Sequence, residues 1–223
     1  MLAPRQNKSV RPKRRTQADR SQQTQQKLLE ATLAIMLRHG YTKLRIAEIA
    51  KVAGTSRGAL LHHFPSKDDV VLATVEFAYT QALERARLTA MRYKRAEDPI
   101  QGIIEDGKEF FFSDFFFLLL DILYSSGDEA AKQKSRELGL RFRLPIEELW
   151  KNVLVEAGLP PETAEDVLWL TFAIVRGMAV RTLFQNDPQR FERLYKLWRE
   201  IFWTYWKAKC GKVGAVKKFA TAG

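Results

Sequence analysis

The chain has 223 residues, a length that fits one large domain or two small ones. Hydrophobic residues make up 46% of it, enough for a sizeable core, and this argues against wholesale disorder. A single cysteine excludes a disulfide framework and favours a protein of the reducing cytoplasm. Charged residues interrupt the two most apolar stretches, 110–124 and 167–184, so we expect no membrane span.

The net charge of +11 is concentrated at the two ends of the chain. Residues 1–20 carry seven Lys or Arg and one Asp, residues 207–223 carry five Lys and no acid, and the segment between them is neutral overall. A basic arm beside a folded module is typical of proteins that bind nucleic acid. A solvated tail without a partner is the alternative, and it is favoured for the C-terminal end. We expect residues 1–20 and 209–223 to be disordered.

The rest of the chain has the periodicity of helices, and no segment alternates with the period of two that a half-buried strand needs. Capping residues, glycines and prolines give the expected boundaries. In chain order, the expected helices cover 21–39, 45–53, 57–63, 67–92, a helix that starts at Pro99, 114–125, 128–157, 162–185 and 189–208. The sequence therefore predicts an all-α fold.

The stretch AKVAGTSRGALLHHFPSKDD predicts two short helices around a tight turn. Gly54 ends the first helix, Ser56 can cap the second through its hydroxyl, and Pro65 stops it. Ser66 can then cap the long helix that follows, with Asp69 at the position that completes a capping box. Two short helices joined in this way form a helix-turn-helix, whose second helix enters the DNA major groove by its N-terminal end.

Residues 40–71, GYTKLRIAEIAKVAGTSRGALLHHFPSKDDVV, resemble the DNA-binding domain of TetR-type transcriptional regulators. The resemblance includes a His-Phe pair at 63–64 followed by Lys67. It implies an all-α homodimer in which residues 21–70 form a three-helix DNA-binding domain and residues 71–208 a larger helical domain for ligand binding and dimerisation. It also implies binding to a palindromic operator on double-stranded DNA and release by a small-molecule effector, with repression the commoner mode in the family.

Arg57 is our first choice for reading a base, because a guanidinium can pair with guanine O6 and N7; a phosphate contact is the alternative. Lys67 opens a helix, where a cation and free N–H groups suit a phosphate. Leu61 stands where the family usually has an aromatic residue that touches the DNA backbone. The expected DNA-binding residues are Arg45, Thr55, Ser56, Arg57, Gly58, His62, His63 and Lys67, with Arg14 and Arg15 reaching an adjacent minor groove.

The two adjacent histidines do not predict a metal site. Neighbouring helical residues point about 100° apart, and only one further His and one Cys are present, fewer ligands than zinc normally takes. The sequence contains no GxSxG, Walker, GxGxxG or HExxH motif. We expect no metal, no cofactor and no enzymatic activity. An architectural DNA-binding protein, indifferent to sequence and without ligand control, is the competing function.

Aromatic residues are frequent after residue 109 and are candidates to line a pocket for an apolar, aromatic or acyl effector. Plain core packing is the alternative for each of them. Arg141, Arg143 and Arg176 are candidates to hold an anionic group of the ligand, and ion pairs explain them equally well. The residues that we select for the effector site are Phe112, Phe116, Tyr124, Arg141, Trp150, Trp169, Phe172 and Arg176.

The last two helices are expected to form the dimer interface. Ala173 and Gly177 are four residues apart, a spacing that allows a partner helix to approach closely. The last helix carries an apolar stripe broader than one surface helix needs, which indicates burial against a partner. The expected interface residues are Ala173, Gly177, Phe191, Leu194, Trp198 and Ile201.

Overall fold

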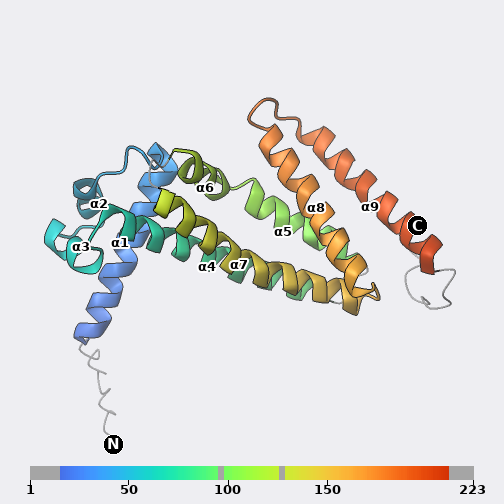
Figure 1. Ribbon diagram of the computed structural model, residues 1–223, viewed down its shortest axis with the longest axis horizontal. Coiled ribbons are helices and arrows are strands. Elements are labelled where there is room, and N and C mark those ends of the chain that lie inside the picture. The colour runs from blue at the N-terminus through green and yellow to red at the C-terminus, as the bar shows by residue number, and fades with distance from the viewer. Residues whose placement is uncertain (1–15, 95–97, 126–128, 211–223) are drawn as a thin grey trace, which may run out of the picture.

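The computed structural model describes residues 16–94, 98–125 and 129–210 (Figure 1). These residues form α-helices and no strand, so the predicted all-α class is confirmed. None of the described helices is long and apolar enough to cross a membrane. In chain order, the helices are α1 (Gln17–His39), α2 (Ile46–Val52), α3 (Arg57–His63), α4 (Lys67–Tyr93), α5 (Pro99–Phe111), α6 (Asp114–Ser125), α7 (Glu129–Glu156), α8 (Pro161–Arg181) and α9 (Pro188–Cys210).

The predicted caps define three of the helix starts. Ser56 Oγ accepts a hydrogen bond from the backbone N–H of the third residue of α3, at 3.1 Å. Ser66 and Asp69 form a reciprocal capping box at the start of α4. Asp98 caps α5, with Pro99 in the first turn, where a missing N–H is harmless. These caps satisfy backbone donors that would otherwise lack partners at the helix ends.

Three of the expected boundaries differ from the structure by more than one residue. Helix α1 begins at Gln17 because Thr16 and Asp19 form a capping box, with Thr16 N donating to Asp19 Oδ2 at 2.8 Å. The predicted disorder of residues 1–20 is therefore wrong for 17–20, and that of 209–223 is wrong for 209–210, which end α9. Helix α8 stops at Arg181, before the expected 185. Arg14, Arg15 and residues 211–223 lie outside the described residues.

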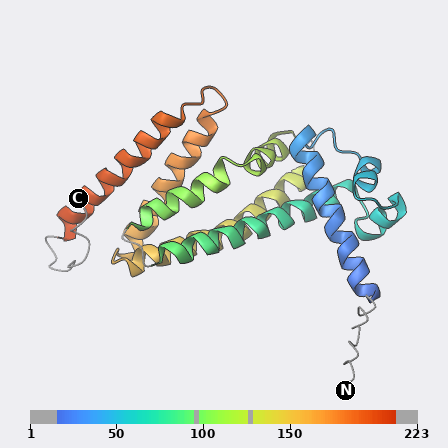
Figure 2. The same ribbon diagram turned by 180° about the vertical axis from the view of Figure 1, so that it is seen from behind.

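The short helices and the last two helices lie at opposite ends of the molecule (Figures 1 and 2). Helices α4 and α7 run side by side along its length, and α8 and α9 form an antiparallel pair at the end away from α1–α3. Buried side chains from Leu28 to Trp206 form a continuous hydrophobic core. The N-terminal half of α1 projects beyond this body and is exposed on nearly all sides.

The glycine that ends α1 lies against α6. Gly40 ends α1 with φ at +80°, a conformation that L side chains rarely adopt. A Cβ at this position would lie 3.3 Å from Asp121 Oδ2. The next backbone N–H, that of Tyr41, donates to the same oxygen at 3.0 Å. A carboxylate of α6 therefore fixes the start of the α1–α2 loop.

Candidate DNA-binding and effector sites

The turn between α2 and α3 presents the N-terminal end of α3 to solvent. Gly54 has φ at +65°, and the N–H of the next residue, Thr55, donates to Ala50 O at 2.9 Å, closing the turn. Ser56, Arg57 and Gly58 are exposed, whereas Thr55 is half-buried. The Arg57 guanidinium makes no hydrogen bond or ion pair within the described part of the chain. Its donors are therefore available to an external acceptor.

The predicted residues around this turn lie on the same three-helix unit. His62 is exposed and His63 half-buried, with their rings edge to face and 5.6 Å apart. Arg45 precedes α2 without capping it, and its Nη1 donates to Thr42 O at 3.2 Å. Leu61, the residue before His62 on α3, is exposed. Within the described residues, no three His, Cys, Asp or Glu side chains group closely enough to hold a metal ion.

Lys67 lies at the first position of α4 and provides a cation beside free backbone donors. Its Nζ donates to Tyr41 O at 3.4 Å and lies 4.6 Å from the centre of the Tyr41 ring. Burial lowers the pKa of Lys67, and the nearby Arg45 guanidinium lowers it further. A cation beside the N–H groups of a helix N-terminus makes a favourable place for an anion.

Three of the eight predicted effector residues are buried in one region, and a fourth, Arg176, is exposed at its edge. The Phe111 ring is 5.2 Å from that of Phe116 and 5.8 Å from that of Phe172, and the Arg176 guanidinium lies 5.8 Å from its centre. Trp150 is fully buried nearby, and its Nε1 donates to Asp106 Oδ2 at 2.9 Å.

The other four predicted effector residues lie elsewhere. Tyr124 is 82% exposed and Trp169 is 60% exposed, so both point away from the core. Phe112 packs against Phe191 of α9, with ring centres 6.2 Å apart. Arg141 is on the surface and pairs with a carboxylate of α4. The predicted set is therefore divided, and Tyr124 and Trp169 do not face the buried aromatic region.

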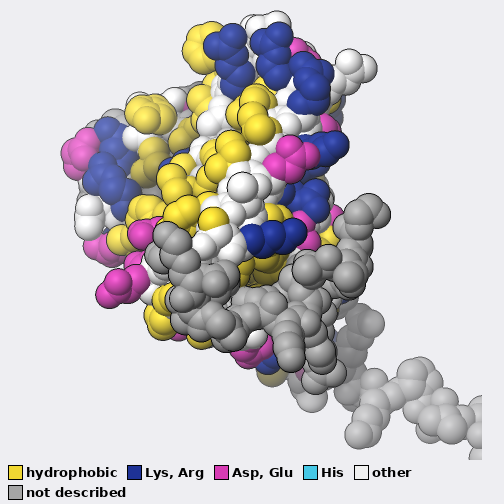
Figure 3. Space-filling view, turned by 90° about the vertical axis from the view of Figure 1, so that its right-hand side faces the viewer, with side chains coloured by type: hydrophobic (Ala, Val, Ile, Leu, Met, Phe, Trp, Pro, Cys, Tyr) yellow, Lys and Arg dark blue, Asp and Glu magenta, His cyan; other side chains and the backbone are white. Residues whose placement is uncertain are grey.

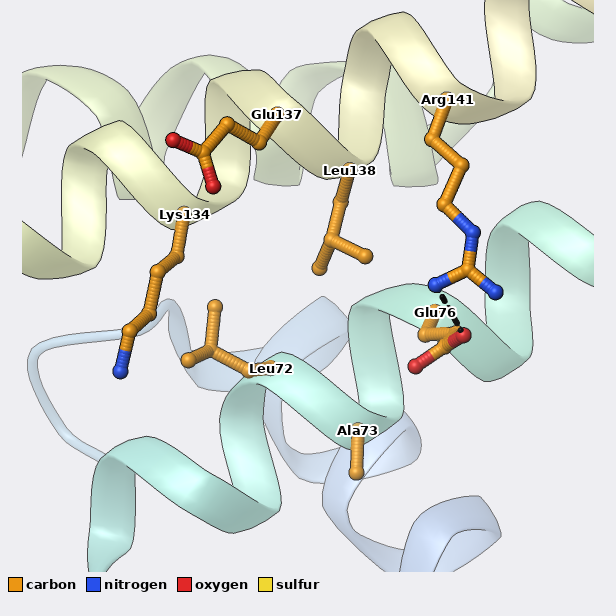
Figure 4. Close-up of a pocket in the computed structure, with 7 residues that line it drawn as sticks. All are labelled: Leu72, Ala73, Glu76, Lys134, Glu137, Leu138 and Arg141. Carbon is orange, nitrogen blue, oxygen red and sulfur yellow. Dashed lines mark ion pairs between the residues drawn. The ribbon is translucent and has the colours of Figure 1, made fainter.

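A groove of about 370 Å³ separates α4 from α7 on the surface (Figure 4). Leu72 and Leu138 face each other across it, and Arg141 Nη1 closes one end by pairing with Glu76 Oε1 at 2.9 Å. The same guanidinium lies 5.5 Å from the Phe142 ring. That ring stacks on Tyr79, with centres 5.4 Å apart, and Tyr79 lies 6.3 Å from Phe110. Contacting rings thus connect the groove to the buried aromatic region.

Two buried polar residues of this region were missed by the sequence reasoning. Asp106 is 6% exposed, and burial raises the pKa of its carboxyl to about 6, while the Trp150 hydrogen bond opposes the increase. Burial likewise raises the pKa of Tyr79 to about 12. The available signal for Asp106 was its place on the apolar stripe of α5, in the same helical row as Ile103. A carboxyl at such a position is retained inside the fold only with a partner.

The α8–α9 pair carries the expected apolar surface. Figure 3, which views the molecule from the α9 end, shows hydrophobic side chains gathered there beside Lys and Arg side chains. Ala173 and Gly177 are exposed, and they line a groove of about 420 Å³ between the helices together with Leu194. The outward-facing large side chains of this pair include Trp169, Leu170, Leu197, Ile201 and Tyr205.

Two of the predicted interface residues are largely engaged within the protomer. Phe191 of α9 is buried against Phe112. Trp198 is half-buried, and its Nε1 donates to Thr171 Oγ1 of α8 at 3.0 Å. Ile201 is 52% exposed and is therefore the large predicted residue most available to a partner.

Comparisons with known proteins agree with this geometry. A family model described as "Bacterial regulatory proteins, tetR family" matches residues 28–74. The HTH-type transcriptional regulator CymR of Pseudomonas putida is 44% identical over 191 residues, which cover 85% of this chain and 94% of that protein. A solved transcriptional regulator from Saccharomonospora viridis, in complex with choline, has a TM-score of 0.60 at 17% identity and covers 80% of this chain and 95% of its own.

A second solved structure, FadR from Bacillus subtilis in complex with stearoyl-CoA, has a TM-score of 0.55 at 18% identity and covers 79% of this chain and 96% of its own. At this identity, the two structures show a shared fold. CymR matches this chain along nearly its whole length, which includes the helix-turn-helix and the larger C-terminal part. The chain therefore belongs to the TetR family of DNA-binding transcriptional regulators and is not an enzyme.

Proposed function

We propose that this regulator is a homodimeric repressor that binds a palindromic operator and leaves it when a small, largely apolar effector binds. The exposed N-terminal end of α3 carries the proposal, because it presents Ser56, Arg57 and Gly58 to solvent on a rigid, capped helix. A recognition helix reads the major groove with this end. The protein would act in the cytoplasm, where the chromosome is.

The proposed DNA contacts divide into base reading and backbone positioning. Arg57 reads a base, since its guanidinium has no partner in the described part of the chain and can form a bidentate pair with guanine. Lys67, at the start of α4, and Arg45, which precedes α2, bind backbone phosphate. Thr55, Ser56, Gly58, His62 and His63 lie around the same turn, and Arg14 and Arg15 would extend the contact into an adjacent minor groove.

The proposed dimer uses the exposed face of α8 and α9. Its apolar side chains, among them Leu170 and Ile201, are more than half exposed in the protomer, and large exposed apolar faces mark interaction sites. A two-fold arrangement places the same face of a second copy on it. Two α3 helices then meet two half-sites, about 34–36 Å apart on one side of B-DNA.

The proposed effector site is the buried aromatic region around Phe111. Its walls come from α5, α7 and α8, and the ring contacts described above connect it to the α4–α7 groove. The two solved structures hold organic molecules, choline in one and stearoyl-CoA in the other, which supports a small-molecule effector for this fold.

Selection of genomic DNA fragments on the purified protein, followed by sequencing, tests the operator hypothesis. We expect a few palindromic sites next to promoters, and broad retention of unrelated fragments would instead favour the architectural function. Arg57→Ala should then lower the preference for the selected site over random DNA by about 1–3 kcal/mol. Arg38→Ala, at an exposed arginine of α1, is the matched control. An equal loss on both DNAs would show that Arg57 contacts phosphate only.

A further inference from the structure

One arginine is enclosed by the aromatic region. The Arg143 guanidinium, on α7, lies 4.5 Å from the centre of the Phe172 ring, 5.3 Å from Phe111 and 5.6 Å from Phe110. Its side chain is only 18% exposed. Rings from α5 and α8 therefore surround a permanent positive charge that belongs to a third helix.

Few of the donors of Arg143 are used. A guanidinium has five N–H donors. Within the described residues, the one ion pair of Arg143 is with Glu147, whose Oε1 lies 3.4 Å from Nη2 one turn along the same helix, and no hydrogen bond accompanies it. Asp106 also acts electrostatically on Arg143, but its Oδ2 already accepts the Trp150 indole N–H. Burying a cation whose N–H donors lack acceptors costs free energy, unless a ligand supplies those acceptors.

The same contacts disfavour a cationic ligand. Aromatic faces attract cations, and a cage of rings is a common seat for a quaternary ammonium group. Here the protein's own guanidinium occupies those faces, and Arg176 adds a second positive charge 5.8 Å from Phe111. An ammonium group entering this region would meet repulsion, whereas a carboxylate would meet attraction and a planar pair of donors.

We propose that Arg143 binds a carboxylate of the effector, whose apolar body packs against Phe110, Phe111 and Phe172. This inference rests on the proposed function, which places the effector in the aromatic region, and it assigns the chemical class of that effector: an apolar organic acid. Aromatic and fatty acids share this chemistry. Entry of the ligand requires the rings to move apart, since they are in contact here.

The test is calorimetric titration of the full-length protein with matched acids and primary amides. The probes are 3-phenylpropionate with 3-phenylpropanamide, decanoate with decanamide, and benzyltrimethylammonium. We expect at least one acid to bind about tenfold or more tightly than its amide, because charge-assisted hydrogen bonds are the stronger ones. The pair that responds distinguishes an aromatic body from an acyl one.

Variants then locate the carboxylate. Arg143→Gln should weaken binding of the acid about tenfold or more and leave binding of the amide unchanged. Arg143→Lys keeps the charge, so its affinity for the acid should fall between those of the native protein and Arg143→Gln. Arg136→Gln, seven residues earlier on α7 and on the surface, is the matched control and should change neither. The proposal is overturned if neither acid binds more tightly than its amide, if the ammonium compound binds best, or if Arg143→Gln binds the acid normally. Operator binding measured without any probe keeps this outcome separate from failure of the proposed DNA-binding function.

Discussion

Ile201→Glu should dissociate the dimer while each protomer stays folded. Ile201 is 52% exposed on α9, so the substitution removes little packing within one protomer. Complete burial of an Ile side chain stabilises by about 1.5–3 kcal/mol, so covering its exposed half contributes about 0.8–1.5 kcal/mol per protomer and about 1.6–3 kcal/mol in a two-fold dimer. A loss of that size raises the dimer dissociation constant roughly 15- to 150-fold. Two carboxylates placed in an apolar interface add to this loss.

Sedimentation equilibrium over a concentration series measures this dissociation constant directly. Leu88→Glu is the matched control, because Leu88 is 63% exposed and belongs to α4 rather than to the α8–α9 pair. Circular dichroism checks that both variants keep the native helix content. A native dissociation constant for Ile201→Glu, or equal dissociation of the Leu88→Glu variant, would refute the assignment of the dimer face to α9.

Two further predictions concern pH and salt. The folded-state pKa of Asp106, raised from 3.8 to about 6, means that the native protein binds this proton more tightly than the unfolded chain. Its contribution to the free energy of unfolding therefore falls by at most about 3 kcal/mol as pH rises from about 4 to about 6. Asp106→Asn should lack this decrease when urea unfolding is measured across that pH range. Parallel plots of unfolding free energy against pH for the native protein and the variant would contradict this. Deleting residues 1–15, which keeps the Thr16 cap, should make operator binding less steeply dependent on salt, by about 0.9 in the logarithmic slope per lost phosphate contact. An unchanged slope would remove the basic arm from the DNA interface.

Helix bounds were predictable where residues within a few positions of each other determine where a helix begins or ends. The bounds of α3 and α6 match the expected 57–63 and 114–125. Ser56 and Ser66 cap their helices as predicted, because a hydroxyl before a helix satisfies a backbone donor within the same few residues. The start of α1 was missed although Thr16 and Asp19 have the spacing of a capping box, because the surrounding basic composition favoured disorder.

The faces of the long helices were not predictable in the same way. Helix α8 is apolar around most of its circumference, so the sequence could not distinguish Leu168, which is buried, from its neighbour Trp169, which is exposed. The distinction depends on where α5 and α7 pack against α8, which the pattern of α8 alone does not contain. For the same reason Trp169 was assigned to the effector site, whereas Asp106, hidden among isoleucines, was not considered.

The hydrogen bond from Tyr41 N to Asp121 Oδ2 has a consequence for engineering hybrid regulators. It joins two residues 80 positions apart, one in the loop after α1 and the other in α6. Exchanging the first 70 residues for those of a relative would cut the sequence between donor and acceptor. Such a chimera needs a glycine at the place of Gly40 and an acidic residue at the place of Asp121. Without the acidic residue, the part-buried N–H loses its acceptor. Without the glycine, a Cβ would lie 3.3 Å from that carboxylate, and the loop after α1 would be pushed away from α6.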